Sequence, residues 1–226
     1  MELPERQKLH IPCIEFSLLS DIQAIGSDLR RNGVRTRIDK INWSEYSYQP
    51  DVLLYAGYTG THLWLLFQVA GDFFRAKALN DQEAVWKDAC VEFFCASGEA
   101  FEKENPVEED IVYRNFEFNA LGTALSAYGT TTHRELLSQE LMGQIVRFST
   151  MDVTNLPQDG TAFDWEMMVA IPLALLGFQP GSSFRANFYK CGDETKRPHF
   201  LSWNRIISRD PNFHLPRFFG EVELLR

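Results

Sequence analysis

The sequence predicts an all-β protein, an antiparallel β-sandwich of the jelly-roll or immunoglobulin-like kind with one or two short peripheral helices. Many short apolar segments are separated by Gly, Pro and Asn turns, which is typical of this class. Three of the segments alternate apolar and polar residues, as strands with one buried face do. No internal repeat or linker-like tract divides the chain. We therefore expect residues 1–226 to form one domain, with residues 1–34 as an N-terminal extension whose short helix packs on the sandwich.

The clearest local signal is a β-hairpin. Residues Val52–Tyr58 and His62–Ala70 read as two strands, and Thr59-Gly60-Thr61 forms the tight turn between them. Further strands are expected at Cys90–Cys95, Tyr113–Leu121, Gln144–Ser149, Phe163–Ile171, Phe184–Lys190, His199–Trp203 and Gly220–Leu224.

Two helices are expected. In "SLLSDIQAIGSDLRRNG", Ser20 is a suitable N-cap, Ile22, Ile25 and Leu29 share one face, and Gly33 follows the end. The segment "THRELLSQELMG" is the second predicted helix, and "PLALLG" is a single helical turn.

Composition excludes several classes of partner. The 226 residues carry a net charge of −9, which disfavours a nucleic-acid partner. The densest basic group, formed by Arg30, Arg31, Arg35 and Arg37, reads as a solvated face. No apolar run reaches the ~18 residues of a membrane span. The first residues, "MELPERQKLHIPCIEF", lack a signal's apolar run. We expect a cytoplasmic location for the chain as given, or a periplasmic or extracellular one if a leader was removed.

Four cysteines are too few for a disulfide scaffold. Cys90 and Cys95 have opposite parity on one predicted strand, so their side chains point to opposite faces. No spacing of cysteine and histidine indicates zinc. We expect free thiols, most of them buried.

Three predicted strands share one pattern. Each places phenylalanines on one face and planar polar groups on the other. The inward set is Phe93, Phe116, Phe118, Phe184 and Phe188, and the outward set is Glu92, Asn115, Glu117, Asn119, Arg185, Asn187 and Tyr189.

Such an outward face suits a sugar. Carboxylates, amides and guanidinium groups bind neighbouring hydroxyls, and an aromatic ring covers the C–H face. The candidate rings are Trp86, Trp203, Tyr189 and Phe213. A salt-bridged structural face is an equal alternative, with Glu92 or Glu117 paired to Arg185. By the same argument Trp86 alone reads first as a packing residue, and His199 and His214 read as structural histidines.

Five motifs in order carry a family resemblance: "VWKDACVEFF", "YRNFEFNALG", "WEMMVAIPLALLG", "FRANFYKCGDETKRPHFLSW" and "PNFHLPRFFG". Together, over about residues 35 to 226, the chain resembles the carbohydrate-binding module family 9-like domains. The resemblance implies a β-sandwich that binds an oligosaccharide or polysaccharide without catalysis and is often attached to, or encoded near, glycan-degrading enzymes. It implies no cofactor, although some members hold a structural calcium ion.

The resemblance also implies site residues. Trp86 and Glu92 match the aromatic residue and the glutamate at the ligand in sugar-binding members, and Trp203 is the second ring of a sandwich around the sugar. Glu117 stands where the binders offer an arginine. With the outward set above, the predicted ligand-binding residues are Trp86, Glu92, Asn115, Glu117, Asn119, Arg185, Asn187, Tyr189 and Trp203. No catalytic residue is assigned, and the metal ligands are left open.

Asp88 precedes the Cys90–Cys95 strand. It is expected to cap a turn or to pair with Lys190 or Arg197, and the family's calcium offers a third role.

Two other functions stay open. Glu92 and Glu117 supply the carboxylate pair that a glycoside-cleaving enzyme needs, but no other catalytic motif supports one. A protein–protein interaction module that has lost sugar binding would also retain the sandwich, and Glu117 in place of arginine is consistent with it.

Overall fold

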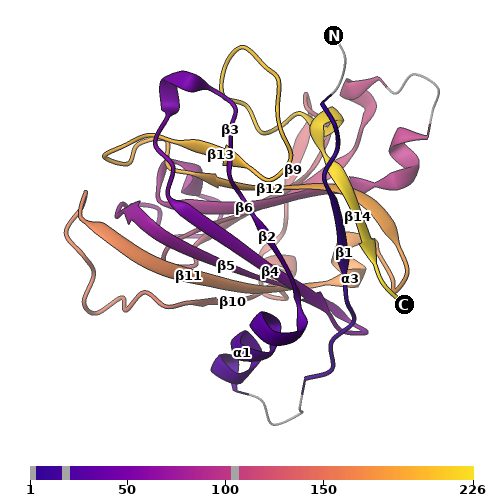
Figure 1. The fold of residues 1–226 in the computed structure, drawn as a ribbon, viewed down its shortest axis with the longest axis horizontal. Helices are drawn as coiled ribbons and strands as arrows, with labels where there is room; N and C mark the ends of the chain where they lie inside the picture. The colour runs from indigo at the N-terminus through magenta and orange to yellow at the C-terminus, as the bar shows by residue number, and fades with distance from the viewer. Residues whose placement is uncertain (1–3, 17–20, 103–106) are drawn as a thin grey trace.

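Two β-sheets packed face to face form the protein (Figure 1). The computed structural model describes residues 4–16, 21–102 and 107–226. The larger sheet has the order β1-β14-β12-β6-β7-β8-β9, with β13 paired to β12 and β3 paired to β13. Its strands are β1 (Lys8–Ile11), β14 (Gly220–Leu224), β12 (Ser183–Cys191), β6 (Cys90–Ser97), β7 (Tyr113–Asn119), β8 (Ala124–Gly129), β9 (Arg134–Leu136), β13 (Phe200–Ser202) and β3 (Lys40–Ile41). The predicted β-sandwich is confirmed.

The smaller sheet has the order β10-β11-β5-β4-β2. Its strands are β10 (Val146–Ser149), β11 (Ala162–Pro172), β5 (His62–Phe73), β4 (Asp51–Tyr58) and β2 (Val34–Arg37). The predicted hairpin is confirmed as β4 and β5, which pair in register from Tyr58↔Leu63 back to Asp51↔Ala70. The other predicted strands are present, with ends that differ by up to two residues. Strands β1, β2, β3, β8 and β9 were not predicted.

The predicted inward face of β6, β7 and β12 is confirmed. These strands are neighbours in the larger sheet, β12 beside β6 and β6 beside β7. Phe93 lies between Phe116 and Phe188, with ring centroids 6.0 Å and 5.2 Å away. All three rings are fully buried against the smaller sheet. Burial of each such side chain contributes about 1.5–3 kcal/mol, so this stack fixes which face of the larger sheet points inward.

The opposite face of these strands differs from the expected exterior surface. The segment from Trp203 to Phe219 crosses it and forms a second apolar cluster there. Phe213 and Phe219 of that segment lie against Tyr189 and Tyr113 of the sheet. The polar residues on this face are therefore buried under a distant part of the chain, which alternation within a strand cannot reveal.

Helix α1 (Ile22–Asn32) covers the outer face of the smaller sheet (Figure 1). Its Leu29 is buried there, and Ile22 and Ile25 pack on the same cluster, as the sequence predicts. The predicted N-cap is wrong: Asp21 caps the helix by accepting a hydrogen bond from the Ala24 amide at 2.7 Å. Ser20 itself lies outside the described residues.

The second predicted helix is mostly wrong. Residues Arg134–Leu136 form β9, which pairs with β8 from Gly129↔Arg134 to Ala127↔Leu136. Only α2 (Gln139–Met142) is helical, and it starts at Ser138, whose side chain accepts from the Leu141 amide. Pairing with β8 outweighs the helix propensity of "RELLSQELM", and this strand brings Arg134 to the site described below.

The remaining helical elements are short. The predicted turn "PLALLG" is confirmed as α3 (Leu173–Leu176), which ends at Gly177 in the left-handed conformation, φ 75°. The 3₁₀ turns are η1 (Ser44–Tyr46), η2 (Val85–Lys87), η3 (Gly98–Phe101), η4 (Glu108–Asp110) and η5 (Pro216–Phe218). Among the described residues, no helix combines the length and the apolarity that a membrane crossing needs.

A buried ion pair crosses the core between the two sheets. Lys190 on β12 and Asp72 on β5 are both fully buried, with Nζ and Oδ2 3.0 Å apart. Asp72 also accepts from Trp165 Nε1 at 3.0 Å, and Lys190 donates to His199 Nε2 at 2.9 Å. His199 Nδ1 in turn donates to the Arg197 carbonyl. Burial and the adjacent Lys190 charge lower the pKa of His199 to about 3, so the ring is neutral and accepts from lysine.

Candidate functional site

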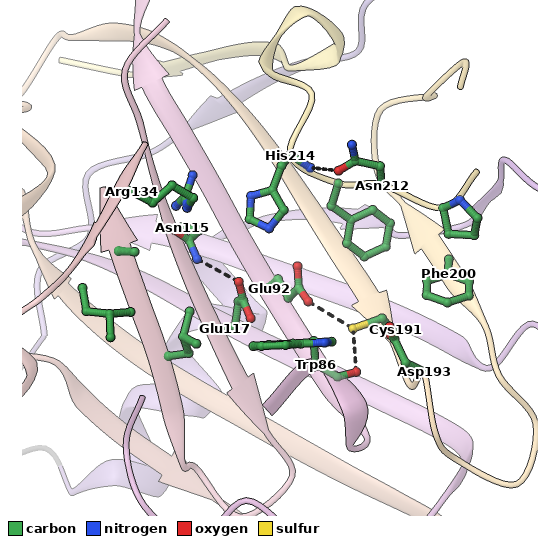
Figure 2. Close-up of a pocket in the computed structure, with 15 residues that line it drawn as sticks. Trp86, Glu92, Asn115, Glu117, Arg134, Cys191, Asp193, Phe200, Asn212 and His214 are labelled. Carbon is green, nitrogen blue, oxygen red and sulfur yellow. Dashed lines mark hydrogen bonds between the residues drawn. The ribbon is translucent and has the colours of Figure 1, made fainter. Parts of the chain in front are cut away.

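A pocket of about 370 Å³ opens on the covered face of the larger sheet (Figure 2). That volume is within the ~300–1,000 Å³ typical of small-ligand sites. Its walls come from η2, β6, β7, β8, β9, the end of β12, the start of β13 and the loops that hold Asp193 and Pro211–His214. The lining residues are Trp86, Glu92, Asn115, Glu117, Leu125, Ala127, Arg134, Leu136, Cys191, Asp193, Phe200, Pro211, Asn212, Phe213 and His214.

Two carboxylates lie side by side in the pocket floor. Glu92 on β6 and Glu117 on β7 are directly opposite in register, on one face of the sheet. They are only 2% and 3% exposed. Burial raises the pKa of Glu117 to about 7. Burial, and then the Glu117 charge, hold the pKa of Glu92 well above its ordinary range. Like charges directly opposite repel, so the pair carries a proton near neutral pH.

Glu117 of this pair and two further lining residues, Asn115 and Arg134, have buried polar atoms without a partner. Asn115 donates through Nδ2 to Glu117 Oε1 at 2.8 Å, but its own Oδ1 accepts from nothing. Glu117 Oε2 and both terminal nitrogens of Arg134 are likewise unpaired. Among the described residues seven buried side-chain atoms lack a partner, and four of them are here. Such groups are costly unless a ligand or water completes them.

Aromatic rings complete the walls. Trp86 on η2 is 37% exposed, although its neighbour Val85 is fully buried. Phe213 stacks on Tyr189 with ring centroids 4.1 Å apart and an interplanar angle of 6°. Figure 2 shows the Trp86 ring below the two carboxylates and His214 above them. An apolar wall beside converging polar groups is the usual composition of a small-molecule site.

The protonation states of the remaining groups follow from their surroundings. Burial, and then the Arg134 charge, lower the pKa of His214 to about 4, so its ring is neutral at pH 7. Its Nδ1 pairs with the Tyr113 hydroxyl at 2.8 Å. Burial raises the pKa of Asp193 to about 6. The guanidinium of Arg134 lies 4.4 Å from the Tyr113 ring centroid, and the Glu117 charge acts on it. Arg134 is the basic residue among those that line the pocket.

Four of the nine predicted ligand-binding residues meet in this pocket: Trp86, Glu92, Asn115 and Glu117. The other five do not line it. Arg185 lies four residues before Tyr189 on β12, roughly 13 Å along the strand. It pairs with Glu221 at 2.7 Å, not with Glu92 or Glu117 as the alternative reading of the sequence required.

Asn187 and Asn119 have structural partners. Asn187 donates to the carbonyls of Asn204 and Phe218, and so ties down the covering segment. Asn119 donates to the Ala78 carbonyl and to Asp88. Both side chains are fully buried, and these bonds occupy the amide hydrogens that the prediction assigned to a sugar.

The two predicted rings also lie elsewhere. Tyr189 is fully buried beneath Phe213 and donates to the Phe213 carbonyl at 3.2 Å, so it supports a wall of the pocket from behind. Trp203 belongs to the core between the sheets, where it contacts Phe188 and donates to Thr36 Oγ1 at 3.0 Å. With 1% exposure it cannot cover a sugar ring opposite Trp86.

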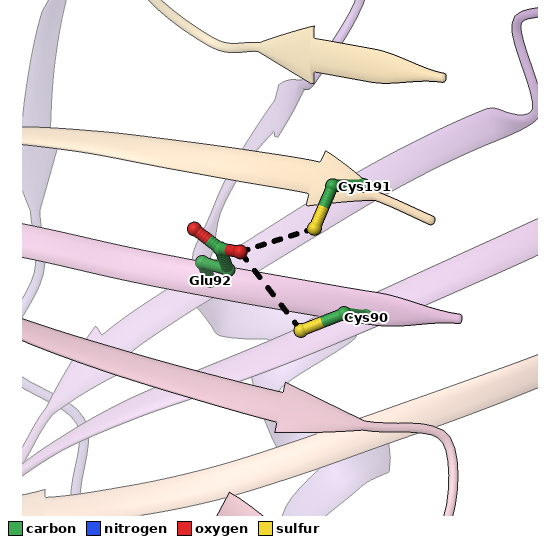
Figure 3. Close-up of side chains that lie close together, drawn as sticks. All are labelled: Cys90, Glu92 and Cys191. Atoms are coloured by element: carbon green, nitrogen blue, oxygen red, sulfur yellow. Dashed lines mark hydrogen bonds between the residues drawn. The ribbon is translucent and has the colours of Figure 1, made fainter. Parts of the chain in front are cut away.

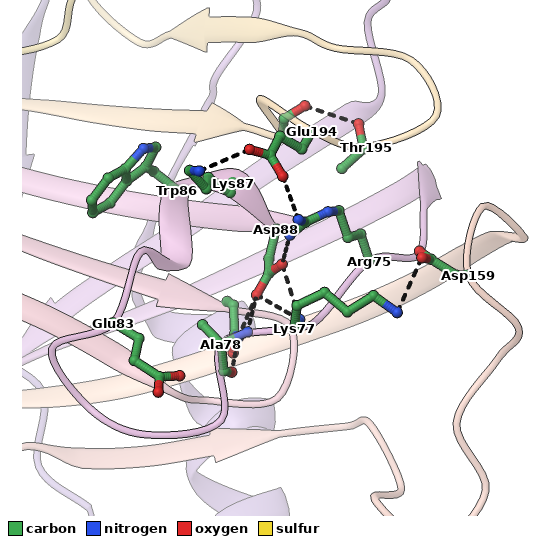
Figure 4. A network of polar contacts seen from close by, with 12 residues as sticks. Arg75, Lys77, Ala78, Glu83, Trp86, Lys87, Asp88, Asp159, Glu194 and Thr195 are labelled. Carbon is green, nitrogen blue, oxygen red and sulfur yellow. Dashed lines mark hydrogen bonds and ion pairs between the residues drawn. The ribbon is translucent and has the colours of Figure 1, made fainter.

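Asp88 is the centre of a structural network (Figure 4). Its carboxylate pairs with Arg75 and accepts from the amides of Lys77 and Ala78, each at 3.0 Å, and from Asn119 Nδ2. The predicted pairing with Lys190 or Arg197 is therefore wrong. Asp88 fixes the loop before η2, and so holds Trp86 at the pocket mouth.

Sequence reasoning missed Arg134, Asp193 and Asn212. Arg134 was hidden because its segment reads as a helix. The β8–β9 hairpin has a sequence signal in "ALSAYGTTTHREL". Apolar and polar residues alternate on either side of a Gly-Thr-Thr-Thr turn there, which is typical of a hairpin. Arg134 brings a guanidinium to the pocket from β9, which lies two strands along the sheet from Glu117 on β7.

The β-sandwich carries a part-apolar pocket with unpaired hydrogen-bonding groups, a composition typical of small-ligand sites. Comparisons with known proteins identify the family of the chain. The model of carbohydrate-binding family 9 matches residues 27–224. The chain belongs to carbohydrate-binding module family 9, whose domains are non-catalytic binding modules. No curated protein matches the chain.

Solved structures agree on the fold. A Bacteroides uniformis ATCC 8492 protein, provisionally assigned as carbohydrate-binding, is 32% identical over 97% of this chain and 99% of that one, with a TM-score of 0.83. A family 9 carbohydrate-binding module from Caldicellulosiruptor kristjanssonii in complex with cellotriose is 12% identical, covers 97% and 94% of the two chains, and has a TM-score of 0.61. A structure of a family 9 module from the same organism with glucose is 11% identical, covers 96% and 95% of the two chains, and has a TM-score of 0.59.

Proposed function

We propose that this protein binds a saccharide non-catalytically in the pocket formed by Trp86, Glu92, Asn115, Glu117 and Arg134, as an accessory to glycan degradation. The observation that carries the proposal is the set of four buried polar atoms left unpaired in this one pocket. Two of these atoms accept and two donate. A sugar hydroxyl both donates and accepts, so adjacent hydroxyls satisfy such a set.

The half-exposed Trp86 supports the same ligand. A pyranose has an apolar C–H face that packs against an aromatic ring, and Trp86 lies beside the polar groups at the mouth of the pocket. Structures of a family 9 module from Caldicellulosiruptor kristjanssonii contain cellotriose and glucose, which makes these two sugars the first to test.

The arrangement of the carboxylates disfavours glycoside cleavage. A glycosidase places its two carboxyl groups on either side of the scissile bond. Glu92 and Glu117 instead project in parallel from register-paired positions on one face, so a sugar rests on the pair and does not lie between them. We expect the wild-type protein to release no reducing sugar from cello-oligosaccharides.

Replacement of Arg134 with methionine is expected to weaken cellotriose binding about 10- to 100-fold, because hydrogen bonds to a charged group contribute about 1.5–3 kcal/mol each. Methionine preserves much of the apolar stem. Titration calorimetry on wild type and variant measures the change, and thermal unfolding checks that the variant folds. Arg35→Met is the matched control, since Arg35 is an exposed arginine on β2 of the other sheet.

A second variant measures the contribution of the Trp86 ring to binding separately from that of the Arg134 charge. Trp86→Ala is expected to remove the tryptophan fluorescence change on cellotriose binding and to weaken affinity several-fold. If both variants bind cellotriose or glucose as wild type does, the pocket is not the saccharide site. If wild type binds neither these sugars nor any glycan on an array, the proposed function is wrong.

A further inference from the structure

We propose that Cys90, Glu92 and Cys191 form a binding site for a thiophilic divalent cation of the zinc class, at the base of the pocket. The three side chains come from adjacent strands, with Cys90 on β6 directly opposite Cys191 on β12. All are at least 98% buried. Figure 3 shows both sulfur atoms turned toward the same carboxylate.

The distances fit one ion. Cys191 Sγ lies 3.0 Å from Glu92 Oε1, Cys90 Sγ lies 4.0 Å from it, and the three ligand atoms all lie within 4.8 Å of one another. Tetrahedral zinc, with Zn–S near 2.3 Å and Zn–O near 2.1 Å, separates its ligands by about 3.5–3.8 Å. Shifts of about 1 Å or less bring the three donors to that spacing, which side-chain torsions supply without movement of the strands.

The charge of the site also favours a cation. Glu92 has the like-charged Glu117 beside it, and Asp193 adds a third acid. In the metal-free protein the Cys191 thiol donates to Glu92 Oε1, and the Cys90 thiol lies buried beside the same carboxylate. A divalent ion displaces the two thiol protons, and the proton of the carboxylate pair stays on Glu117. Two thiolates, the Glu92 carboxylate and the ion then carry one net negative charge.

The three donor atoms favour one class of metal and leave one of its four coordination positions free. Two thiolates with one carboxylate suit zinc and its neighbours, whereas calcium takes six to eight oxygen ligands. Cys191 and Glu92 line the pocket, which supplies a path for the ion. A fourth tetrahedral position directed to the pocket would hold water. The cation site shares Glu92 with the proposed saccharide pocket, but it does not depend on the proposed function, because the ion can bind in the absence of a sugar.

Cobalt(II), a spectroscopic substitute for zinc, tests the site. Reduced, metal-free protein titrated with Co²⁺ is expected to bind one equivalent, with thiolate charge-transfer and tetrahedral visible bands. Zn²⁺ is expected to remove these bands, and Ca²⁺ to leave them unchanged. Cys90→Ser and Cys191→Ser should each lose the bands and bind at least tenfold more weakly, while Cys95→Ala and Cys13→Ser should behave as wild type. Cys95 is buried on the opposite, core-facing side of β6, and Cys13 is exposed.

Measurements on the wild-type protein test the site even if the cysteine variants fail to fold. Zn²⁺ binding to wild type is expected to release about two protons per ion and to raise the midpoint of thermal unfolding. Failure of wild type to bind Co²⁺ or Zn²⁺, or equal bands in the Cys90 and Cys191 variants, would overturn the site. The titration contains no sugar, and the glycan titrations are run with a chelator, so failure of one proposal is distinguishable from failure of the other.

Discussion

Replacement of Lys190 with methionine is expected to lower the free energy of unfolding by about 3–5 kcal/mol, the usual cost of removing one partner of a buried ion pair. Methionine fills much of the space but leaves the Asp72 carboxylate in the core without its cation. The remaining hydrogen bonds, from Trp165 Nε1 and the Phe73 amide, do not neutralise it. Denaturant unfolding of wild type and variant measures the difference.

Two further variants isolate the cause. Lys87→Met removes an ion pair with Glu194 in which both side chains are nearly half exposed, so we expect a loss below about 1 kcal/mol. The double variant Lys190→Met with Asp72→Asn keeps a carbonyl acceptor for Trp165 and removes the stranded charge. It should be more stable than Lys190→Met alone. Equal stability of the double and single variants would show that lost packing, not the unpaired carboxylate, causes the effect.

Glu117→Gln is expected to remove a pH dependence of stability that amounts to about 3 kcal/mol, because one pKa unit corresponds to about 1.4 kcal/mol. The pKa of Glu117 rises from its ordinary 4.5 to about 7 in the folded chain. Between these values the unfolded chain loses a proton that the folded chain retains, so stability falls as pH rises through the window. Glutamine mimics the protonated acid and keeps an acceptor for Asn115.

The free energy of unfolding of wild type and of Glu117→Gln, measured near pH 5 and near pH 7.5, tests this expectation. His214 and His199, whose pKa values are lowered, act in the opposite sense: their contribution is present above pH 6.5 and is lost as pH falls. The informative quantity is therefore the difference between wild type and Glu117→Gln. Glu140→Gln, a change at an exposed residue of α2, should retain the wild-type pH profile. The same profile in Glu117→Gln would contradict a buried carboxylate pair.

The sequence predicts correctly the features that depend on neighbouring residues of one strand, such as the face of the sheet to which each side chain points. Alternation in β6, β7 and β12 correctly separates the phenylalanine face from the polar face, because side chains on a strand change sides at every residue. The same alternation continues to Lys190, which follows Phe188 on the inward face and is indeed buried. Its partner Asp72 lies on the other sheet, and strand periodicity carries no information about contacts between sheets.

The candidate site could be predicted only in part for the same reason. Trp86, Glu92, Asn115 and Glu117 meet because they belong to adjacent strands or to the turn that leads into one of them. Whether the polar face is open or covered depends on the segment from Trp203 to Phe219, which arrives from more than eighty residues away. Trp203 illustrates the limit, because its indole lies on the core side of the sheet.

A crystal structure of the protein with cellotriose tests the central claim most directly, because it locates the ligand. We expect a glucose ring against Trp86, with hydroxyl groups within about 3 Å of the Arg134 guanidinium and of Glu117 Oε2. A cellotriose bound away from this pocket, for example beside Arg185 at the other end of β12, would contradict the account. A pocket without bound sugar, at cellotriose concentrations that saturate binding in solution, would also contradict the account.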